Sequence, residues 1–174
     1  MDFKKEVLNL GLQLNNDQEE KFLTYFTELV EVNKYMNLTA ITKKDEVYRK
    51  HFLDSLEIVR AIDNKEKYTL CDVGSGAGFP SIPLAIVDSN VNVTIIDALN
   101  KRIKFLNELT SKLGLSNVEA LHRRAEDYVK KVGASFDIVT ARAVARLNVL
   151  VELCLPLVKV GGKFIAMKGS CGHE

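Results

Sequence analysis

The sequence predicts an α/β fold in which a doubly wound parallel sheet follows an N-terminal helical extension. From residue 68 onward, short apolar runs alternate with stretches of helical spacing, and a glycine-rich turn connects the first run to the first helix. The 63 residues before the sheet have only helical patterns. Alternating strands and helices with right-handed crossovers form a parallel sheet. We therefore expect a helical subdomain at 1–63 and a sheet domain at 64–174.

Composition places the chain among ordinary globular proteins. Of its 174 residues, 47% are hydrophobic and 27% are charged. No apolar run approaches the roughly 20 residues that cross a membrane, and three scattered cysteines do not suit a disulfide framework or a zinc site. We expect a cytoplasmic protein with no membrane and no metal partner. The net charge of +1 is uneven, because residues 1–63 contribute −3 and residues 64–174 contribute +4.

Two helices and a polar break are expected before the sheet. The first helix has an apolar stripe with the spacing i, i+3, i+4, i+7, i+8. Its members are Phe22, Tyr25, Phe26, Leu29 and Val30. The second helix begins at Thr42, with Asp45 as its capping partner three residues later. Its stripe consists of Tyr48, Phe52, Leu56, Val59 and Ile62.

The sheet region predicts five strands and four helices. The strands are expected at 69–73, 91–96, 118–121, 136–140 and 163–167. The helices are expected at 81–87, 101–113, 125–131 and 145–158. Ligands of such sheets bind beyond the carboxyl ends of the strands, so functional residues should gather there.

The segment 72–80, Asp-Val-Gly-Ser-Gly-Ala-Gly-Phe-Pro, is the most informative motif. Glycines at alternate positions permit a tight turn and a close approach of a ligand to the backbone. Phe79 stands where the dinucleotide fingerprint requires its third glycine, which argues against that fingerprint. Asp72 would suit a ligand with a cationic group. A tight strand-to-helix connection without a ligand is the alternative.

Charged residues follow the remaining strands. Asp97 ends the second strand and can accept hydrogen bonds from a ribose diol, or it caps the next helix. Glu126 suits a ligand site, and equally the N-terminus of a helix. The basic residues that follow strands include Arg124, Arg142 and Lys168. An electropositive edge beside a nucleoside pocket favours a polyanionic partner such as RNA.

His51, Asp54 and Ser55 share one face of the second helix. A hydrogen bond that packs this helix explains the group. A catalytic triad is disfavoured, because no acyl-transfer loop accompanies it.

Together these residues resemble the Rossmann-like class I methyltransferases. More narrowly, the chain is similar to the bacterial 16S ribosomal RNA guanine-N7 methyltransferases, the glucose-inhibited division protein B family. The segments that carry the resemblance are 37–40, 51–56, 72–83, 97–106, 124–126, 142–143 and 167–169. The resemblance implies S-adenosyl-L-methionine as cofactor, and 16S ribosomal RNA or the small ribosomal subunit as partner.

The resemblance also implies roles for individual residues. Together with the pattern at the strand ends, it predicts a cofactor site formed by Gly74, Gly76, Phe79, Asp97, Ala125, Glu126 and Arg142. Arg124 and Lys168 are expected to face RNA. No residue is assigned as a catalytic acid or base, since guanine N7 has a free lone pair.

One departure from the family pattern concerns the end of the chain. Family members continue after Lys168 with a helix and two strands, whereas this sequence ends at Glu174. We therefore expect a sheet without its C-terminal strands. A non-catalytic form that binds cofactor or RNA is the first alternative. A nicotinamide-dependent oxidoreductase is the second, and Phe79 disfavours it.

Overall fold

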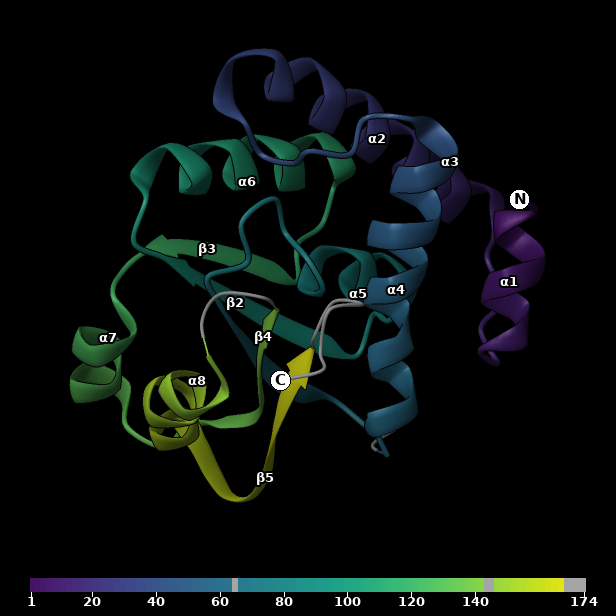
Figure 1. The fold of residues 1–174 in the computed structure, drawn as a ribbon. Helices are drawn as coiled ribbons and strands as arrows, with labels where there is room; N and C mark the ends of the chain where they lie inside the picture. Colours follow the sequence, from purple (N-terminus) through teal and green to yellow (C-terminus); the bar gives the residue numbers. More distant parts are fainter. Residues whose placement is uncertain (64–65, 143–145, 168–174) are drawn as a thin grey trace.

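The computed structural model of the protein describes residues 1–63, 66–142 and 146–167. Its centre is a five-stranded sheet in the order β3-β2-β1-β4-β5, and all neighbouring strands are parallel (Figure 1). The strands are β1 (Tyr68–Val73), β2 (Val91–Asp97), β3 (Val118–His122), β4 (Phe136–Arg142) and β5 (Val158–Met167). The predicted doubly wound sheet is confirmed, with the glycine-rich turn following its central strand.

Helices cover both faces of this sheet. The N-terminal part contains α1 (Phe3–Asn9), α2 (Asn16–Met36), α3 (Lys44–Val47), the π-helical turn η1 (Tyr48–Leu53), α4 (Asp54–Leu56) and the 3₁₀ turn η2 (Glu57–Ala61). The helices between strands are α5 (Ser81–Val87), α6 (Asn100–Leu113), α7 (Ala125–Val132), and α8 (Leu147–Cys154) with the 3₁₀ turn η3 (Leu155–Leu157). In Figure 1, α2 lies along α6, while α7 and α8 lie on the other side of the sheet.

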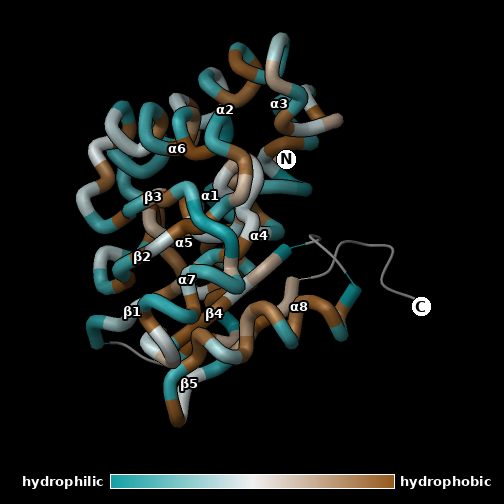
Figure 2. Tube along the Cα trace, turned by 90° about the vertical axis from the view of Figure 1, so that its left-hand side faces the viewer, coloured by the Kyte–Doolittle hydropathy of each residue, from teal (hydrophilic) through white to brown (hydrophobic). Residues whose placement is uncertain are grey.

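Side chains that alternate along the strands form two separate cores. Leu70 belongs to the core that includes α2, α5 and α6, whereas the next residue, Cys71, belongs to the core under α7 and α8. Val139 joins Cys71 in the second core, and Ile138 joins Leu70 in the first. A strand covered on both faces has this pattern, because successive side chains point to opposite faces. Figure 2 shows brown, apolar segments along the sheet and on α8, and a mixture of teal and brown segments on α2 and α6.

An aromatic cluster joins the N-terminal helices to the sheet. Phe22 of α2 lies 5.0 Å from Phe3 of α1 and 5.1 Å from Phe52 of η1, measured between ring centroids. Phe22 and Phe52 are fully buried and belong to the same core as Leu70 of β1. One core therefore extends across residue 63. The division of the chain into two domains at this residue remains a prediction.

Two predicted helix boundaries are wrong. Thr42 and Asp45 do not cap a helix, since α3 begins at Lys44 and has no side-chain cap. The helix expected at 145–158 ends at Cys154, because Pro156 lacks the N–H that a continuing α-helix requires. Residue 145 itself lies outside the described residues.

The fifth strand begins earlier than predicted. It starts at Val158 rather than at residue 163, and its register with β4 shifts between Phe136 and Ile138. Gly161 has a φ of +83°, a conformation that glycine adopts readily. Because the pairing is irregular here, the first half of β5 lacks the alternation of apolar residues that indicates a strand in the sequence.

Replacement of Phe22 by alanine is predicted to destabilise the protein by about 3–5 kcal/mol, because it empties the centre of the aromatic cluster. Tyr35 on the same helix is 76% exposed, so Tyr35→Ala should change stability by less than about 0.5 kcal/mol. Denaturant unfolding of the two variants measures both values. Equal losses would contradict the cluster as the joint between helices and sheet.

Candidate functional site

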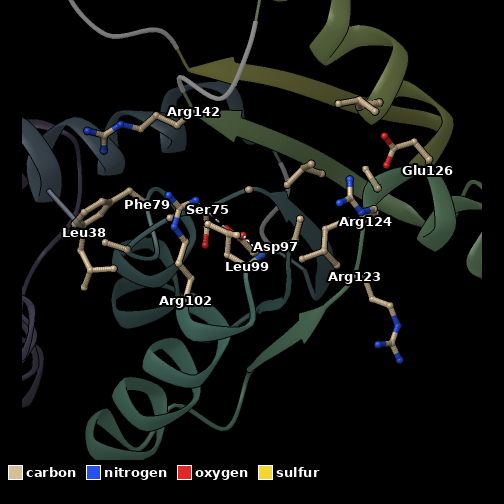
Figure 3. A pocket seen from close by; sticks show the side chains of 18 residues that line it. Leu38, Ser75, Phe79, Asp97, Leu99, Arg102, Arg123, Arg124, Glu126 and Arg142 are labelled. Atoms are coloured by element: carbon tan, nitrogen blue, oxygen red, sulfur yellow. Dashed lines mark hydrogen bonds and ion pairs between the residues drawn. The ribbon is translucent and has the colours of Figure 1, made fainter. Parts of the chain in front are cut away.

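A pocket of about 550 Å³ opens at the carboxyl ends of β1 to β4, in the size range of small-molecule sites. Figure 3 shows Leu38 and Phe79 at one end of it, and Arg123, Arg124 and Glu126 at the other. Every residue that the sequence assigned to the cofactor lies in its wall. These residues are Gly74, Gly76, Phe79, Asp97, Ala125, Glu126 and Arg142. The structure brings them together, and their contact with a cofactor remains a prediction.

The glycine-rich loop after β1 is held by a side chain of the N-terminal helices. Gly74, Gly76 and Gly78 have φ values of +68°, +61° and +100°, which favour glycine. The buried hydroxyl of Tyr25 on α2 donates a hydrogen bond to the carbonyl oxygen of Ala77, at 2.6 Å. A Cβ on Gly78 would lie 2.7 Å from this hydroxyl. The sequence showed Tyr25 only as a member of an apolar stripe and gave no signal of this contact.

The ring of Phe79 packs between groups from three parts of the chain. It stacks on the His51 imidazole at a centroid distance of 4.6 Å and an interplanar angle of 14°. Tyr25 stacks on it at 5.5 Å, and the guanidinium carbon of Arg142 lies 5.2 Å from its centroid. A glycine at this position would make none of these contacts. Phe79 therefore fixes the end of the loop against η1 and β4.

Asp97 presents a buried carboxylate oxygen to the pocket. Its Oδ1 accepts a hydrogen bond from the amide of Leu99 at 2.9 Å, and its side chain is 3% exposed. Its Oδ2 has no hydrogen-bond partner in the described part of the chain, and Arg102 NH1 lies 3.6 Å away. The N-cap of α6 is Leu99, so the interpretation of Asp97 as the helix cap is wrong. A hydroxyl of a ligand can donate to the free oxygen.

Asp72 lies beneath the glycine-rich loop rather than in the pocket wall. It is fully buried, and its Oδ2 accepts a hydrogen bond from the amide of Ser81 at 3.3 Å, at the start of α5. Burial raises the pKa of Asp72 to about 7, against the opposing effects of Ser81 and Arg142. The expectation that Asp72 faces a cationic ligand is therefore not met.

Arg142, the last residue of β4, is tied to the helical turn that contains His51. Its NH1 donates to Ser55 Oγ at 3.2 Å, and its NH2 donates to the carbonyl oxygen of Lys50 at 3.1 Å. His51 Nδ1 lies 2.9 Å from NH2, and an Asp54 carboxylate oxygen lies 3.8 Å from Nε. Ser55 Oγ also donates to the carbonyl oxygen of His51 within the same turn. The contacts of Ser55 and His51 with Arg142 are the predicted hydrogen bonds that pack this helix.

Basic side chains surround the opposite end of the pocket. Arg123 and Arg124 lie at this end, while Arg102 lies nearer Phe79 (Figure 3). All three follow strands and belong to the electropositive edge that the sequence predicts. Lys168, the second residue expected to face RNA, lies outside the described residues. Leu38, from the polar break after α2, also lines the pocket. Its surroundings in the sequence did not indicate a role in the site.

Two negative findings apply to residues 1–63, 66–142 and 146–167. None of the helices in these ranges is long and apolar enough to cross a membrane. No group of three His, Cys, Asp or Glu side chains there is placed to hold a metal ion.

Replacement of Asp72 by asparagine is predicted to stabilise the folded protein increasingly as pH rises. The pKa of this carboxyl is about 7 in the folded protein and 3.8 ordinarily, so the folded state binds more protons between about pH 4 and 7. The wild type should therefore lose stability through this interval relative to Asp72→Asn. Chemical unfolding of both proteins from pH 4 to pH 8 measures the difference between their free energies of unfolding. The contributions of all other titrating groups cancel in this difference. A difference independent of pH would contradict the raised pKa.

Comparison with known proteins supports the interpretation of the pocket. The family described as rRNA small subunit methyltransferase G matches residues 18–174. The chain is 58% identical to ribosomal RNA small subunit methyltransferase G of Staphylococcus saprophyticus over 165 residues, 94% of this chain and 69% of that protein. It is 56% identical to the Bacillus cereus protein of the same name over 174 residues, 99% of this chain and 73% of that protein.

Solved structures resemble the fold at low sequence identity. A putative S-adenosyl-L-methionine-dependent methyltransferase of Methanococcus maripaludis superimposes with a TM-score of 0.61 at 16% identity, covering 83% of this chain and 62% of that one. The YcgJ protein of Bacillus subtilis superimposes with a TM-score of 0.56 at 19% identity, covering 67% and 50%. These two structures show a shared fold. The match to the methyltransferase family and its relatives favours methyl transfer over the nicotinamide chemistry considered above. The chain belongs to the rRNA small subunit methyltransferase G family, whose members depend on S-adenosylmethionine.

Proposed function

We propose that the pocket binds S-adenosylmethionine and that the protein methylates N7 of a guanine in 16S ribosomal RNA. In this proposal the ribose hydroxyls donate to Asp97, and Ala125 and Glu126 lie beside the adenine. The amino acid end of the cofactor lies over Gly74 and Gly76. The family and its relatives support the reaction class and the RNA substrate. The geometry of the pocket supports the placement of the cofactor.

The observation that carries the placement is Asp97 Oδ2, which accepts no hydrogen bond in the described part of the chain and has the Arg102 guanidinium 3.6 Å away. A buried carboxylate oxygen without a hydrogen bond is costly, so its site suits a ligand that brings a donor. Asp97 ends β2, next to β1 and the glycine-rich loop that follows it. A ribose diol offers two hydroxyl donors of the required kind.

Arg142 has donors left for a carboxylate of the cofactor. Arginine has five N–H groups. Ser55 accepts from NH1, while Lys50 and His51 occupy NH2. One hydrogen on NH1 remains outside these bonds, and the hydrogen on Nε has only the Asp54 carboxylate nearby, at 3.8 Å. Arg142 also lines the pocket. We infer that these groups hold the anionic end of the cofactor.

In the reaction, the protein positions the cofactor and the guanine and excludes water from the site. The bound cofactor supplies a methyl group on a positively charged sulfur. Guanine N7 carries a free lone pair and loses no proton when it is methylated, so the protein has no need of a general base. Buried Phe79 and the apolar wall residues Leu38 and Leu153 exclude water from part of the pocket. Fixed geometry then supplies the rate.

The basic end of the pocket suits the RNA. Arg124 lines the pocket at this end and Arg123 lies beside it, while Arg102 lies nearer Phe79 (Figure 3). Positive charges at this edge suit the phosphates of RNA. We propose that Arg124 contacts RNA, that Lys168 does so as well, and that the protein works in the cytoplasm, where ribosomal RNA is found. An RNA partner also agrees with the names of the relatives.

Transfer of a tritiated methyl group tests the proposed reaction. Small ribosomal subunits that lack the modification are incubated with the protein and labelled S-adenosylmethionine, and the modified base is mapped. We expect label on N7 of one guanine. Cofactor binding without transfer would instead support the non-catalytic alternative, and label on another atom would contradict the proposed chemistry.

Replacement of Gly76 by alanine is predicted to weaken S-adenosylmethionine binding at least about tenfold. A Cβ at Gly76 meets no protein atom within 4 Å, so it would extend into free space at the pocket wall. Gly114, which ends α6, is a matched control, because its φ of +65° is close to the +61° of Gly76 and its Cβ would also be free. Both variants carry the same backbone strain, of about 1–2 kcal/mol. Calorimetric titration should show weaker binding in Gly76→Ala only.

Replacement of Tyr25 by phenylalanine is predicted to weaken cofactor binding about fivefold, because the loop loses a hydrogen bond that contributes about 1 kcal/mol. Tyr68→Phe is the control, since the Tyr68 hydroxyl donates to Asp88 Oδ2 at 2.7 Å, where β1 begins. Both variants should melt at lower temperature. Cofactor affinity should fall for Tyr25→Phe alone, and equal affinities would show that the Tyr25 bond does not support the site.

Replacement of Arg124 by alanine is predicted to weaken RNA binding and to reduce the slope of log affinity against log salt by about 0.7, the value for one phosphate contact. Cofactor affinity should not change. Lys130, exposed on the helix that follows Arg124 and ion-paired with Asp127, is the control. A loss of cofactor binding in Arg124→Ala would move Arg124 from the RNA to the cofactor.

A further inference from the structure

His51 occupies a position between the cofactor loop and the last residue of β4. One face of its imidazole lies against Phe79, at a centroid distance of 4.6 Å. Its Nδ1 lies 2.9 Å from Arg142 NH2, and its Nε2 lies 2.7 Å from Thr39 Oγ1. Both neighbouring side chains, Phe79 and Arg142, line the pocket, whereas His51 itself does not. The imidazole therefore contacts two groups of the pocket from behind.

The hydrogen bonds define the protonation state of the ring. Arginine can only donate, so His51 Nδ1 must accept and carries no proton. A neutral imidazole then has its proton on Nε2, where it donates to Thr39 Oγ1. Thr39 Oγ1 also accepts from the amide of Ile41 at 3.0 Å, which fixes the hydroxyl at the end of the chain of bonds. The polar break after α2 thus specifies one tautomer of His51.

The charges around the ring favour the same state. Burial and the positive charge of Arg142 lower the pKa of His51 to about 4, against the opposing effect of a hydrogen bond to the Lys50 backbone. Asp54, the nearest acid of the group, lies beside Arg142 Nε at 3.8 Å. An imidazolium would lose the Nδ1 acceptor and place a second cation against Arg142. The π-helical turn that carries His51 is a type of distortion frequent at functional sites.

We propose that His51, as the neutral Nε2–H tautomer, is a positioning residue for methyl transfer that holds the Arg142 guanidinium against Phe79 in the orientation that receives the cofactor. The acceptors Lys50 O and His51 Nδ1 take up both hydrogens of NH2, so the guanidinium cannot rotate without breaking two bonds. This proposal deepens the function proposed above and rests on the assignment of Arg142 to the cofactor.

Two substitutions of His51 separate its acceptor from its ring. His51→Phe keeps an aromatic ring against Phe79 but removes both nitrogens. His51→Asn offers an amide oxygen close to the position of Nδ1. We expect His51→Phe to raise the KM for S-adenosylmethionine about tenfold, the effect of one lost hydrogen bond to a charged group. The KM for RNA should stay unchanged, and His51→Asn should recover affinity to within about threefold of the wild type.

The controls distinguish failure of this inference from failure of the proposed function. Glu57→Ala, an exposed change at the start of η2, should leave every parameter unchanged. Arg142→Met should weaken cofactor binding, and adding His51→Phe to it should cause no further loss. If Arg142→Met retains wild-type affinity, the cofactor role of Arg142 is wrong, and the inference falls with it. If Arg142→Met weakens binding but His51→Phe does not, only the positioning role of His51 is wrong.

Two further results decide the matter independently of activity. Nitrogen NMR of labelled histidine should show an unprotonated Nδ1 and a protonated Nε2 at neutral pH. The reverse tautomer would overturn the proposal. Equal losses of cofactor affinity in His51→Phe and His51→Asn, together with equal falls in melting temperature, would show that the residue only packs the helix.

Discussion

The packing of Phe79 against the N-terminal helices is the interaction on which the rest of the site depends. A parallel sheet supplies the position of the loop after β1, but it does not supply a lateral support for it. That support comes from Tyr25, which bonds to Ala77, and from His51, which stacks on Phe79. The N-terminal helices therefore support the wall of the pocket, because the glycine-rich loop contacts them directly.

This arrangement also explains how a charged group is tolerated at the wall of the pocket. The Arg142 side chain is only 16% exposed, and loss of hydration would be costly without compensation. Ser55, Lys50 and His51 provide oxygen and nitrogen acceptors, and Phe79 provides the face of a ring. The same positive charge opposes the rise in the pKa of Asp72. Arg142, the last residue of β4, therefore links the glycine-rich loop to the turn η1 electrostatically.

Much of the fold and the composition of the site could be predicted from the sequence. The alternation of strands and helices identifies the parallel sheet, and the rule that ligands bind at the carboxyl ends brings Gly74, Asp97 and Arg142 together although they are far apart in the chain. Both depend on local periodicity and topology, which a sequence displays directly.

The contacts that fix these residues could not be predicted in the same way. The hydrogen bond from Tyr25 to Ala77 joins residues that are 52 positions apart. In the sequence, Tyr25 looks like any other residue of an apolar stripe. The position of Asp72 beneath the loop depends on which face of β1 it occupies, and a strand buried on both faces gives no alternation to show it. The π-helical turn at Tyr48–Leu53 has no recognisable sequence signal, yet it presents His51 to Arg142.

An NMR titration of the labelled protein with S-adenosylmethionine tests the central claim most directly. The account predicts that backbone amide shifts concentrate in the loop 74–79, around Asp97 and at Ala125, with further changes at His51 because its contacts with Phe79 and Arg142 transmit binding. Shifts confined to the smaller cavity near Ala61 and Gly162, or a loop that responds without any change at His51, would contradict it.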